Sequence, residues 1–373
     1  MAKTEPFDRY YDQYEQWFTE HKHAFYSELE AVRRLMPMKG KGVEIGIGSG
    51  VFASPLGISE GCDPSAEMRR QAEARGIKAI NGVAENLPYK DESFDYAIMV
   101  TTICFVDDPE GALAEVNRIL KPDGKIIIGF VDRDSKVGNK YLREKDKSLF
   151  YRDAAFFSTD EILSLLKQND FIIEKTAQTL FGTLDSVKKT QSVKSGYGEG
   201  SFVVISAKKK FTGPIRFALA VDSANNFDIK QFCCAWSFKI YEWDNREFRY
   251  LEEIINPFRN EKEDEISDRK RKGEILTGLL KKESIDVIVS RNFGFNVEIA
   301  VSNFIPVIVF SETPAEVRDI LTKHIEWIRD ELQNRAGDYK LFTIRQGIMK
   351  TSVHGDSRRN SNRDWPKHLG END

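Results

Sequence analysis

Two neighbouring apolar segments near the N-terminus end in glycines and carboxylates. Residues 43–50 read VEIGIGSG, with Glu44 inside the apolar run and Gly46 and Gly48 in the turn that follows. Glycine allows a backbone to approach a ligand closely, and the amide N–H groups of such a turn can face it. Asp63 lies 17 residues after Gly46, where the next apolar segment ends and a carboxylate can accept both hydroxyls of a ribose. Their order predicts a nucleotide-like ligand at two adjacent strand ends.

Each of these features also has a simpler interpretation. The glycines could serve only a tight turn, and Asp63-Pro64-Ser65 could be a turn that caps a helix. Found together and in this order, they favour a ligand. The spacing Glu-x-Gly-x-Gly-x-Gly differs from the Gly-x-Gly-x-x-Gly of dinucleotide-binding proteins, and this difference argues against a nicotinamide-dependent oxidoreductase.

Strand and helix patterns alternate around these residues. Apolar runs predict strands at 43–47, 57–62, 77–80, 94–100, 125–131, 171–179 and 201–207. Helices are expected within 8–36 and over 66–75 and 109–120, and the six residues after Gly50 leave room for only a very short helix. The loop between the last two strands is too short for a helical crossover, so those strands should pair antiparallel. The predicted fold is a doubly wound, Rossmann-like α/β sheet of seven strands with the last antiparallel.

Four segments resemble the successive motifs of class I S-adenosylmethionine-dependent methyltransferases, of the type 11-like group. They read VEIGIGSG, GCDPS, GVAENLPYKDESFDYAIMV and LAEVNRILKPDGKIIIG, and the resemblance extends over about residues 7–207. It implies that the methyl donor, S-adenosylmethionine, binds across the ends of the first strands of the sheet.

The resemblance also implies which residues contact the donor. Gly46 and Gly48 would pass under the methionine part, and Glu44 would help order the loop and the donor's amino group. Asp63, with Pro64 and Ser65 beside it, would hold the ribose. The adenine would be bordered by Ala84, Glu85 and Asn86. The sulfonium would lie near Val100, Thr101 and Thr102. Two side chains of the N-terminal helix would close over the site: Tyr11 and Trp17.

Methyl transfer needs few catalytic groups. Holding the nucleophile and the methyl group together can supply ~7–11 kcal/mol of the barrier. A general base is required only when the acceptor must lose a proton. No catalytic residue is therefore assigned, and the acceptor is expected to be a small molecule. Candidates for the acceptor pocket are Phe105, Tyr141, Tyr151 and Arg152.

A second domain is predicted after a polar linker at 208–214. Segments of residues 215–332, IRFALAVD, FDIKQFCCAWSFKIYEW and IDVIVSRNFGFNVEIAVSNFIPVIVF, resemble the dinitrogenase iron–molybdenum cofactor biosynthesis family, a small RNase H-like α/β domain. The segment RKRKGE lacks the histidine usual in that family. Residues 333–373 are predicted to be a polar tail.

The adjacent thiols of Cys233 and Cys234 leave two interpretations open. In a reduced compartment they could bind a soft metal or an iron–sulfur cluster. The simpler interpretation is that they pack as small apolar residues, so no metal ligand is assigned. A protein partner that binds through the second domain is a further expectation.

Composition excludes several classes of protein. The net charge of −4 argues against a nucleic-acid binder. No run of ~18 apolar residues predicts a membrane span. Four cysteines without a C-x-x-C or disulfide pattern indicate a reducing cytoplasm. The sequence thus predicts a cytoplasmic methyltransferase with an accessory domain, and the alternative is a non-catalytic protein that senses S-adenosylmethionine or carries a metallocluster.

Overall fold

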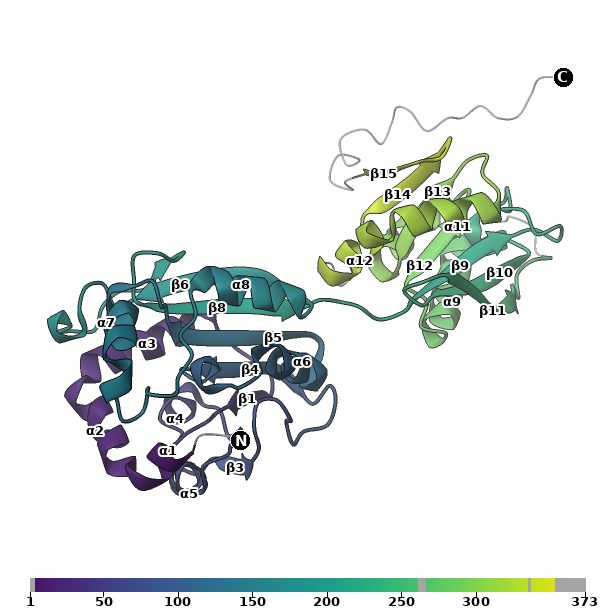
Figure 1. Ribbon diagram of the computed structural model, residues 1–373. Helices are drawn as coiled ribbons and strands as arrows, with labels where there is room; N and C mark the ends of the chain where they lie inside the picture. The colour runs from purple at the N-terminus through teal and green to yellow at the C-terminus, as the bar shows by residue number, and fades with distance from the viewer. Residues whose placement is uncertain (1–3, 261–265, 335–336, 353–373) are drawn as a thin grey trace. The chain divides into compact units, whose positions relative to one another are not determined.

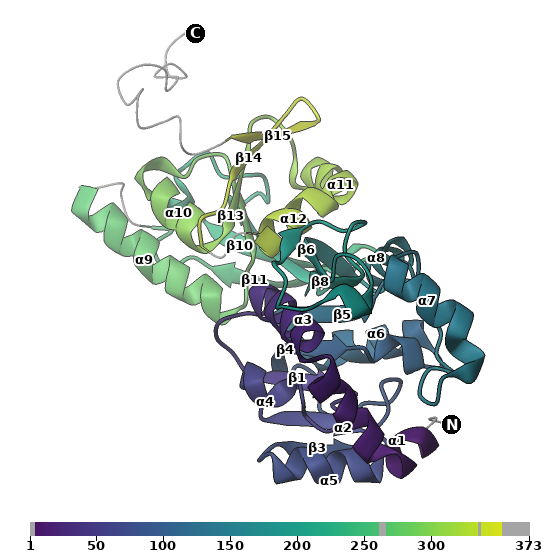
Figure 2. The ribbon, with the colours of Figure 1, turned by 90° about the vertical axis from the view of Figure 1, so that its left-hand side faces the viewer.

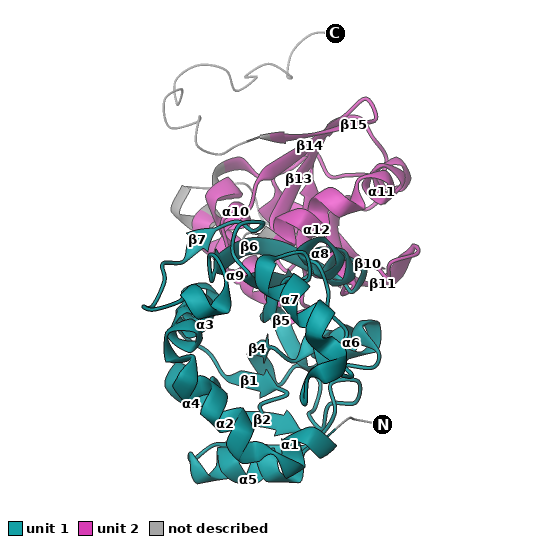
Figure 3. Ribbon diagram, turned by 60° about the vertical axis from the view of Figure 1, so that its left-hand side comes forward, with its two compact units in different colours: residues 1–210 teal, residues 211–373 magenta. Residues whose placement is uncertain are grey.

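The chain forms two compact units. A computed structural model describes residues 4–260, 266–334 and 337–352. The units are residues 1–210 and 211–373 (Figure 3), and the boundary lies inside the segment predicted as a linker, 208–214. Each unit is a sheet covered by helices and is described by itself.

The first unit is built on an eight-stranded sheet. Its order is β3-β2-β1-β4-β5-β8-β6-β7, in which β1 to β5 are parallel and β8 is antiparallel to both β5 and β6. These strands span Gly42–Ile45 (β1), Glu60–Asp63 (β2), Lys78–Asn81 (β3), Phe94–Val100 (β4), Leu120–Val131 (β5), Phe171–Thr179 (β6), Lys194–Ser195 (β7) and Phe202–Lys209 (β8). The predicted Rossmann-like sheet and the antiparallel pairing of its last two long strands are confirmed.

The predicted number of seven strands is wrong. The additional strand, β7, contains only Lys194 and Ser195, which pair with β6 at the edge of the sheet. Both residues are exposed, so β7 buries no apolar side chain. A strand of this kind has no alternating apolar pattern, and sequence periodicity therefore could not detect it.

Eight α-helices cover this sheet (Figure 1), among the residues that the structure describes in this unit. They are Glu5–Arg9 (α1), Tyr11–Glu20 (α2), Lys22–Leu35 (α3), Ala53–Leu56 (α4), Ala66–Ala74 (α5), Pro109–Ile119 (α6), Lys136–Glu144 (α7) and Thr159–Gln168 (α8). The short helix predicted after the glycine loop is confirmed, because α4 has four residues and ends at Gly57, which has a φ of +74°. The segment 8–36, which was expected to contain one or two helices, is divided among three: α1, α2 and α3.

Alternate residues of the central strands enter two different cores. Ala97 and Met99 of β4 pack in a core with side chains of α6 and α8. Ile98, between them, packs on the other face with residues of α3 and α4. Figure 2 shows α3 alongside β5. Because both faces are covered, β4 and the second half of β5 are nearly continuous apolar runs, as parallel strands in three-layer folds are.

The second unit is a mixed seven-stranded sheet of order β11-β10-β9-β12-β13-β14-β15. Its first three strands in chain order are Ile215–Val221 (β9), Ser237–Trp243 (β10) and Phe248–Ile255 (β11). The sheet is completed by Val287–Ser290 (β12), Ile305–Val309 (β13), Leu341–Arg345 (β14) and Ile348–Ser352 (β15). Helices Ile266–Lys282 (α9) and Val297–Asn303 (α10) contribute to one core, and Pro314–Lys323 (α11) and Ile325–Asn334 (α12) to the other.

The predicted tail at 333–373 began too early. Residues 341–352 form the hairpin of β14 and β15, whose turn residues Gln346 and Gly347 both have positive φ. Buried Phe342 and Ile344 alternate with less buried neighbours, as in a half-buried strand. The polar residues around this short alternation concealed it. Residues 353–373, the rest of the predicted tail, lie outside the described residues.

No helix of the described residues is both long and apolar enough to cross a membrane.

Candidate functional site

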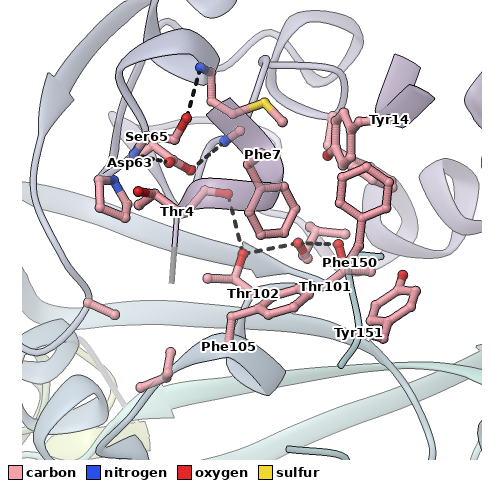
Figure 4. Close-up of a pocket in the computed structure, with 18 of the residues that line it drawn as sticks. Thr4, Phe7, Tyr14, Asp63, Ser65, Thr101, Thr102, Phe105, Phe150 and Tyr151 are labelled. Atoms are coloured by element: carbon pink, nitrogen blue, oxygen red, sulfur yellow. Dashed lines mark hydrogen bonds between the residues drawn. The ribbon is translucent and has the colours of Figure 1, made fainter. Parts of the chain in front are cut away.

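A cavity of about 520 Å³ opens at the carboxyl ends of β1, β2 and β4, beneath α1, α2 and α7. Its size is typical of small-molecule sites, which measure ~300–1,000 Å³. Figure 4 shows Asp63 and Ser65 at one end, Tyr14, Phe150 and Tyr151 at the other, and Phe7 between them. The cavity brings together fourteen of the residues predicted for the site: Trp17, Gly46, Gly48, Asp63, Pro64, Ser65, Ala84, Glu85, Val100, Thr101, Thr102, Phe105, Tyr141 and Tyr151.

The loop after β1 requires glycine at two positions. Gly46 and Gly48 have φ values of +67° and +54°, which L-residues with side chains rarely adopt. A Cβ on Gly46 would lie 2.3 Å from Cγ2 of Thr102. A Cβ on Gly48 would lie 3.3 Å from the hydroxyl oxygen of Tyr14. The loop therefore places bare backbone against the cavity wall.

Asp63 links this loop to the end of β2. One of its carboxylate oxygens accepts a hydrogen bond from the Gly48 N–H at 2.9 Å, and the other accepts one from the Ser65 N–H at 2.9 Å. Burial raises the pKa of Asp63, while these two backbone donors oppose the rise. A carboxylate has about four acceptor positions, so further donors such as hydroxyls can still bind. Asp63 thus holds the loop in place and can still accept hydrogen bonds in the cavity.

Glu44 lies behind the loop and does not line the cavity. Its side chain is buried, and among the described residues its Oε2 has no hydrogen-bond partner. Burial raises the pKa of Glu44 well above its usual range, and the N–H of Ala53, in the first turn of α4, opposes this. Glu44 therefore connects β1 to α4 as a buried acid under the glycine loop.

Three other predicted residues lie outside the cavity wall. Tyr11 begins α2 and does not line the cavity, whereas Tyr14, three positions later in the same helix, does. Asn86 closes a turn through its backbone N–H, which donates to Val83, and Val83 lines the cavity instead. Arg152 is exposed, with its guanidinium 3.8 Å from Asp153. The structure therefore places these three residues outside the cavity wall, and their roles in binding stay predictions.

The end of β4 is joined to the glycine loop. Thr101 has a φ of +52°, a conformation that costs of order 1–3 kcal/mol and persists where surrounding contacts impose it. Its N–H donates to the carbonyl of Gly129 at 2.7 Å. The Thr102 hydroxyl lies 3.1 Å from the Val100 carbonyl and 3.3 Å from the Gly46 carbonyl. These contacts fix the strand end where the predicted sulfonium neighbours lie.

Aromatic side chains cover the cavity, and most of them were not among the predicted site residues. The Phe7 ring lies 5.3 Å from that of Phe105 and 5.5 Å from that of Phe150. Tyr14 adds an edge contact with Phe150 at 6.0 Å. The spacing of Tyr14 and Phe18 by four residues was the available signal, because it places both on one face of α2; Phe7 belongs to the separate helix α1.

Aromatic rings from distant segments also form the far end of the cavity. Tyr141 of α7 stacks on Tyr151 with ring centroids 5.0 Å apart, and Tyr151 stacks on Phe105 at 5.8 Å. Three of the four residues predicted for the acceptor pocket therefore meet. The side chain of Glu28, from α3, lines the same cavity and is only 4% exposed.

Glu28 could have been found from helix periodicity. It lies four residues after Ala24 and four before Val32, both fully buried, so it occupies the apolar face of α3. Burial raises the pKa of Glu28 to about 8. An acid on a buried face is unusual enough to mark a functional position.

The two thiols of the second unit lie in a short 3-10 turn, Phe232–Cys234, with their sulfur atoms 3.6 Å apart. Both are buried, and Asn256 donates to the Cys233 carbonyl at 3.1 Å. Within the described part of the chain, no three His, Cys, Asp or Glu side chains gather as a metal site. The predicted metal cluster gains no support from this arrangement.

Comparisons with known proteins concern about half of the chain. Residues 43–128 match a family model described as a methyltransferase domain. An uncharacterised protein of Methanocaldococcus jannaschii is 48% identical over 203 residues, which are 54% of this chain and 98% of that protein. An uncharacterised protein of Mycobacterium tuberculosis is 33% identical over 188 residues, 48% of this chain and 65% of its own length.

One solved structure is similar at high sequence identity. It comes from Thermotoga maritima and is described as an S-adenosylmethionine-dependent methyltransferase, possible histamine N-methyltransferase. Sequence identity is 52%, the TM-score is 0.54, and the match covers 56% of this chain and 100% of the other.

Proposed function

Since this chain belongs to the S-adenosylmethionine-dependent methyltransferases, we propose that its cavity binds that donor at the Asp63 end and a small-molecule acceptor at the aromatic end. The methyl acceptor itself is not named by the family. The two ends differ in chemistry: one offers a carboxylate and backbone amides, the other aromatic rings and Glu28.

The residues present fit the methyl donor. The half-buried carboxylate of Asp63 suits a ribose diol, and the bare backbone of Gly46 and Gly48 allows close approach of the amino acid part. Apolar side chains after β3, from Val83 and Ala84, suit the faces of an adenine. The buried, unpartnered Oε2 of Glu44 behind the loop is a further polar group that a bound ligand could order.

Bound S-adenosylmethionine supplies a methyl carbon on a positively charged sulfur; the acceptor's electron pair bonds to that carbon while the C–S bond breaks and leaves its electrons on sulfur. The chain's contribution is to orient the two molecules and to exclude water. The Thr101–Thr102 strand end holds the centre of the cavity, while Phe7 and Phe150 cover it.

The arrangement that carries this proposal is Asp63, whose carboxylate accepts hydrogen bonds from the Gly48 N–H and the Ser65 N–H and lines the cavity. Isothermal calorimetry with S-adenosylhomocysteine tests it. We expect the intact chain to bind and Asp63→Ala to lose at least tenfold in affinity. Asp91→Ala, at an exposed acid elsewhere in the unit, should keep the wild-type affinity. Equal affinity of wild type and Asp63→Ala, or no binding by wild type, would contradict the proposed function.

For the second unit we propose an accessory role, either in binding a protein partner or, as the alternative, in carrying a metallocluster. Support for an RNase H-like domain is limited to a mixed sheet with helices on both faces. Analysis of iron, molybdenum and sulfide in anaerobically purified protein separates the two roles. Stoichiometric metal that disappears in Cys233→Ala and Cys234→Ala would favour the cluster, whereas metal-free protein would oppose it.

A further inference from the structure

The aromatic end of the cavity contains one carboxyl group without a partner. Glu28 is 4% exposed, and in the described part of the chain no hydrogen bond or ion pair reaches its carboxylate. Its side chain nevertheless lines the cavity. An isolated buried acid is unfavourable unless something pairs with it, because the charged form loses its hydration. Nothing that the structure describes in this unit supplies that pair.

The surroundings of Glu28 are aromatic. The phenol rings of Tyr141 and Tyr151 stack at 5.0 Å in the cavity wall that Glu28 also lines. Burial raises the pKa values of both phenols, and the nearby Glu28 charge adds to the rise. Phe105 extends this stack on the side of Tyr151. Aromatic faces attract cations, and they do so more strongly where water is excluded. A carboxylate among aromatic faces is a binding site for a positively charged nitrogen.

We infer that the acceptor of this enzyme is a small amine, whose basic nitrogen Glu28 holds against the rings of Tyr141 and Tyr151. This inference rests on the proposed function and adds the acceptor class to it. A neutral alcohol or an anion is a poorer occupant: the alcohol offers no positive charge to pair with Glu28 when the acid ionises, and an anion would be repelled by that charge.

The position of Glu28 separates it from the donor end. The donor-side polar groups, Asp63 and the Gly48 amide, are already joined to each other. Glu28 instead lines the cavity together with the stacked pair of Tyr141 and Tyr151. Its substitution should therefore change acceptor affinity and leave donor affinity unchanged.

Calorimetry with matched probes tests the inference. Two pairs of probes, 2-phenylethylamine with 2-phenylethanol and butylamine with butanol, are titrated into the intact chain saturated with S-adenosylhomocysteine. We expect at least one amine to bind about tenfold or more tightly than its alcohol, and Glu28→Gln to reduce that preference roughly tenfold to hundredfold. Glu30→Gln, an exposed acid of the same helix paired with Arg33, should keep it.

Proton release provides a second readout that a packing role would not change. The titratable groups that face Glu28 within this end of the cavity are the phenols of Tyr141 and Tyr151, with the Cys104 thiol and Tyr14 next to Tyr151. All of these stay neutral at pH 7 because burial raises their pKa values. Binding of an ammonium ion should therefore release close to one proton, from Glu28, and none in Glu28→Gln. Titrations in two buffers of different ionisation enthalpy measure this number.

The outcomes are distinguishable. Equal affinity for every amine and its alcohol, or a preference that persists in Glu28→Gln, would overturn the inference while binding of S-adenosylhomocysteine still supports the methyltransferase. Loss of S-adenosylhomocysteine binding in Glu28→Gln would also overturn it, because the carboxylate would then belong to the donor end. Failure of the wild type to bind S-adenosylhomocysteine would contradict the proposed function itself.

Discussion

Replacement of Glu28 by glutamine should stabilise the first unit, by an amount that grows with pH. In the folded protein burial raises the pKa of Glu28 to about 8, against an ordinary value of 4.5. Between these two values the unfolded chain has lost the proton that the folded chain keeps, so wild-type stability falls as pH rises. Glutamine does not titrate and has nearly the same shape.

The size of the effect follows from the two pKa values. Their separation of about 3.5 corresponds to roughly 5 kcal/mol over the whole interval, at 1.36 kcal/mol per pKa unit. Below pH 4.5 the acid is neutral in both states, and the titration contributes no difference between the proteins. At pH 7 the expected advantage of Glu28→Gln is roughly 3 kcal/mol, and it is complete once the pH exceeds about 8.

The measurement must follow the first unit alone, because the intact chain has two units and need not unfold in one step. Pulsed hydrogen exchange of peptides from β4 and β5 during urea unfolding achieves this, since both strands lie in the core of that unit. Wild type, Glu28→Gln and Glu30→Gln are compared at pH 5, 7 and 8.5. A Glu28→Gln advantage that does not change with pH, or a wild type that is the more stable protein at pH 8.5, would refute the reasoning.

Two further pairs of substitutions test the loop and the hairpin. Gly46→Ala places a Cβ where a threonine side chain lies and should abolish detectable S-adenosylhomocysteine binding in calorimetry. Gly57→Ala, also at positive φ but with open space around it, should cost only about 1 kcal/mol of stability and retain binding. Comparable binding by both variants would contradict the described loop. Phe342→Ala should destabilise the second unit by ~3–5 kcal/mol in urea unfolding, against less than ~0.5 kcal/mol for Ile348→Ala, because the first ring is fully buried and the second side chain is 58% exposed. Equal effects of these two would contradict the placement of β14 in the core.

Local patterns were sufficient to place most of the predicted donor-side residues at strand ends. Glu44, Gly46 and Asp63 are close in sequence to the strand ends that hold them, so strand periodicity alone fixes their positions. The parallel order of β1, β2 and β4 then brings these ends to one edge of the sheet. Such patterns do not give side-chain direction, as for Asn86, whose backbone N–H closes the turn while its side chain does not line the cavity.

The acceptor side could be predicted only in part, because it is assembled by tertiary packing. Tyr141 and Tyr151 were expected as single residues, but their stacking depends on how the segment after β5 folds over the cavity. Tyr14 and Phe150 approach each other from opposite parts of the unit. No short-range pattern specifies such contacts, and a one-residue error in helix phase would point Tyr14 elsewhere.

The distribution of unpaired polar groups argues that acceptor choice, rather than donor binding, depends on Glu28. At the donor end Asp63 already accepts two backbone hydrogen bonds, so its placement contributes to folding as well as to binding. Glu28 has no such contacts within the described residues, and its burial lowers stability at neutral pH. A group that only reduces stability is readily replaced unless it contributes elsewhere. Its contribution must then arise when the cavity is filled, and among molecules that fit beside stacked phenols a cationic amine gains the most from a buried carboxylate.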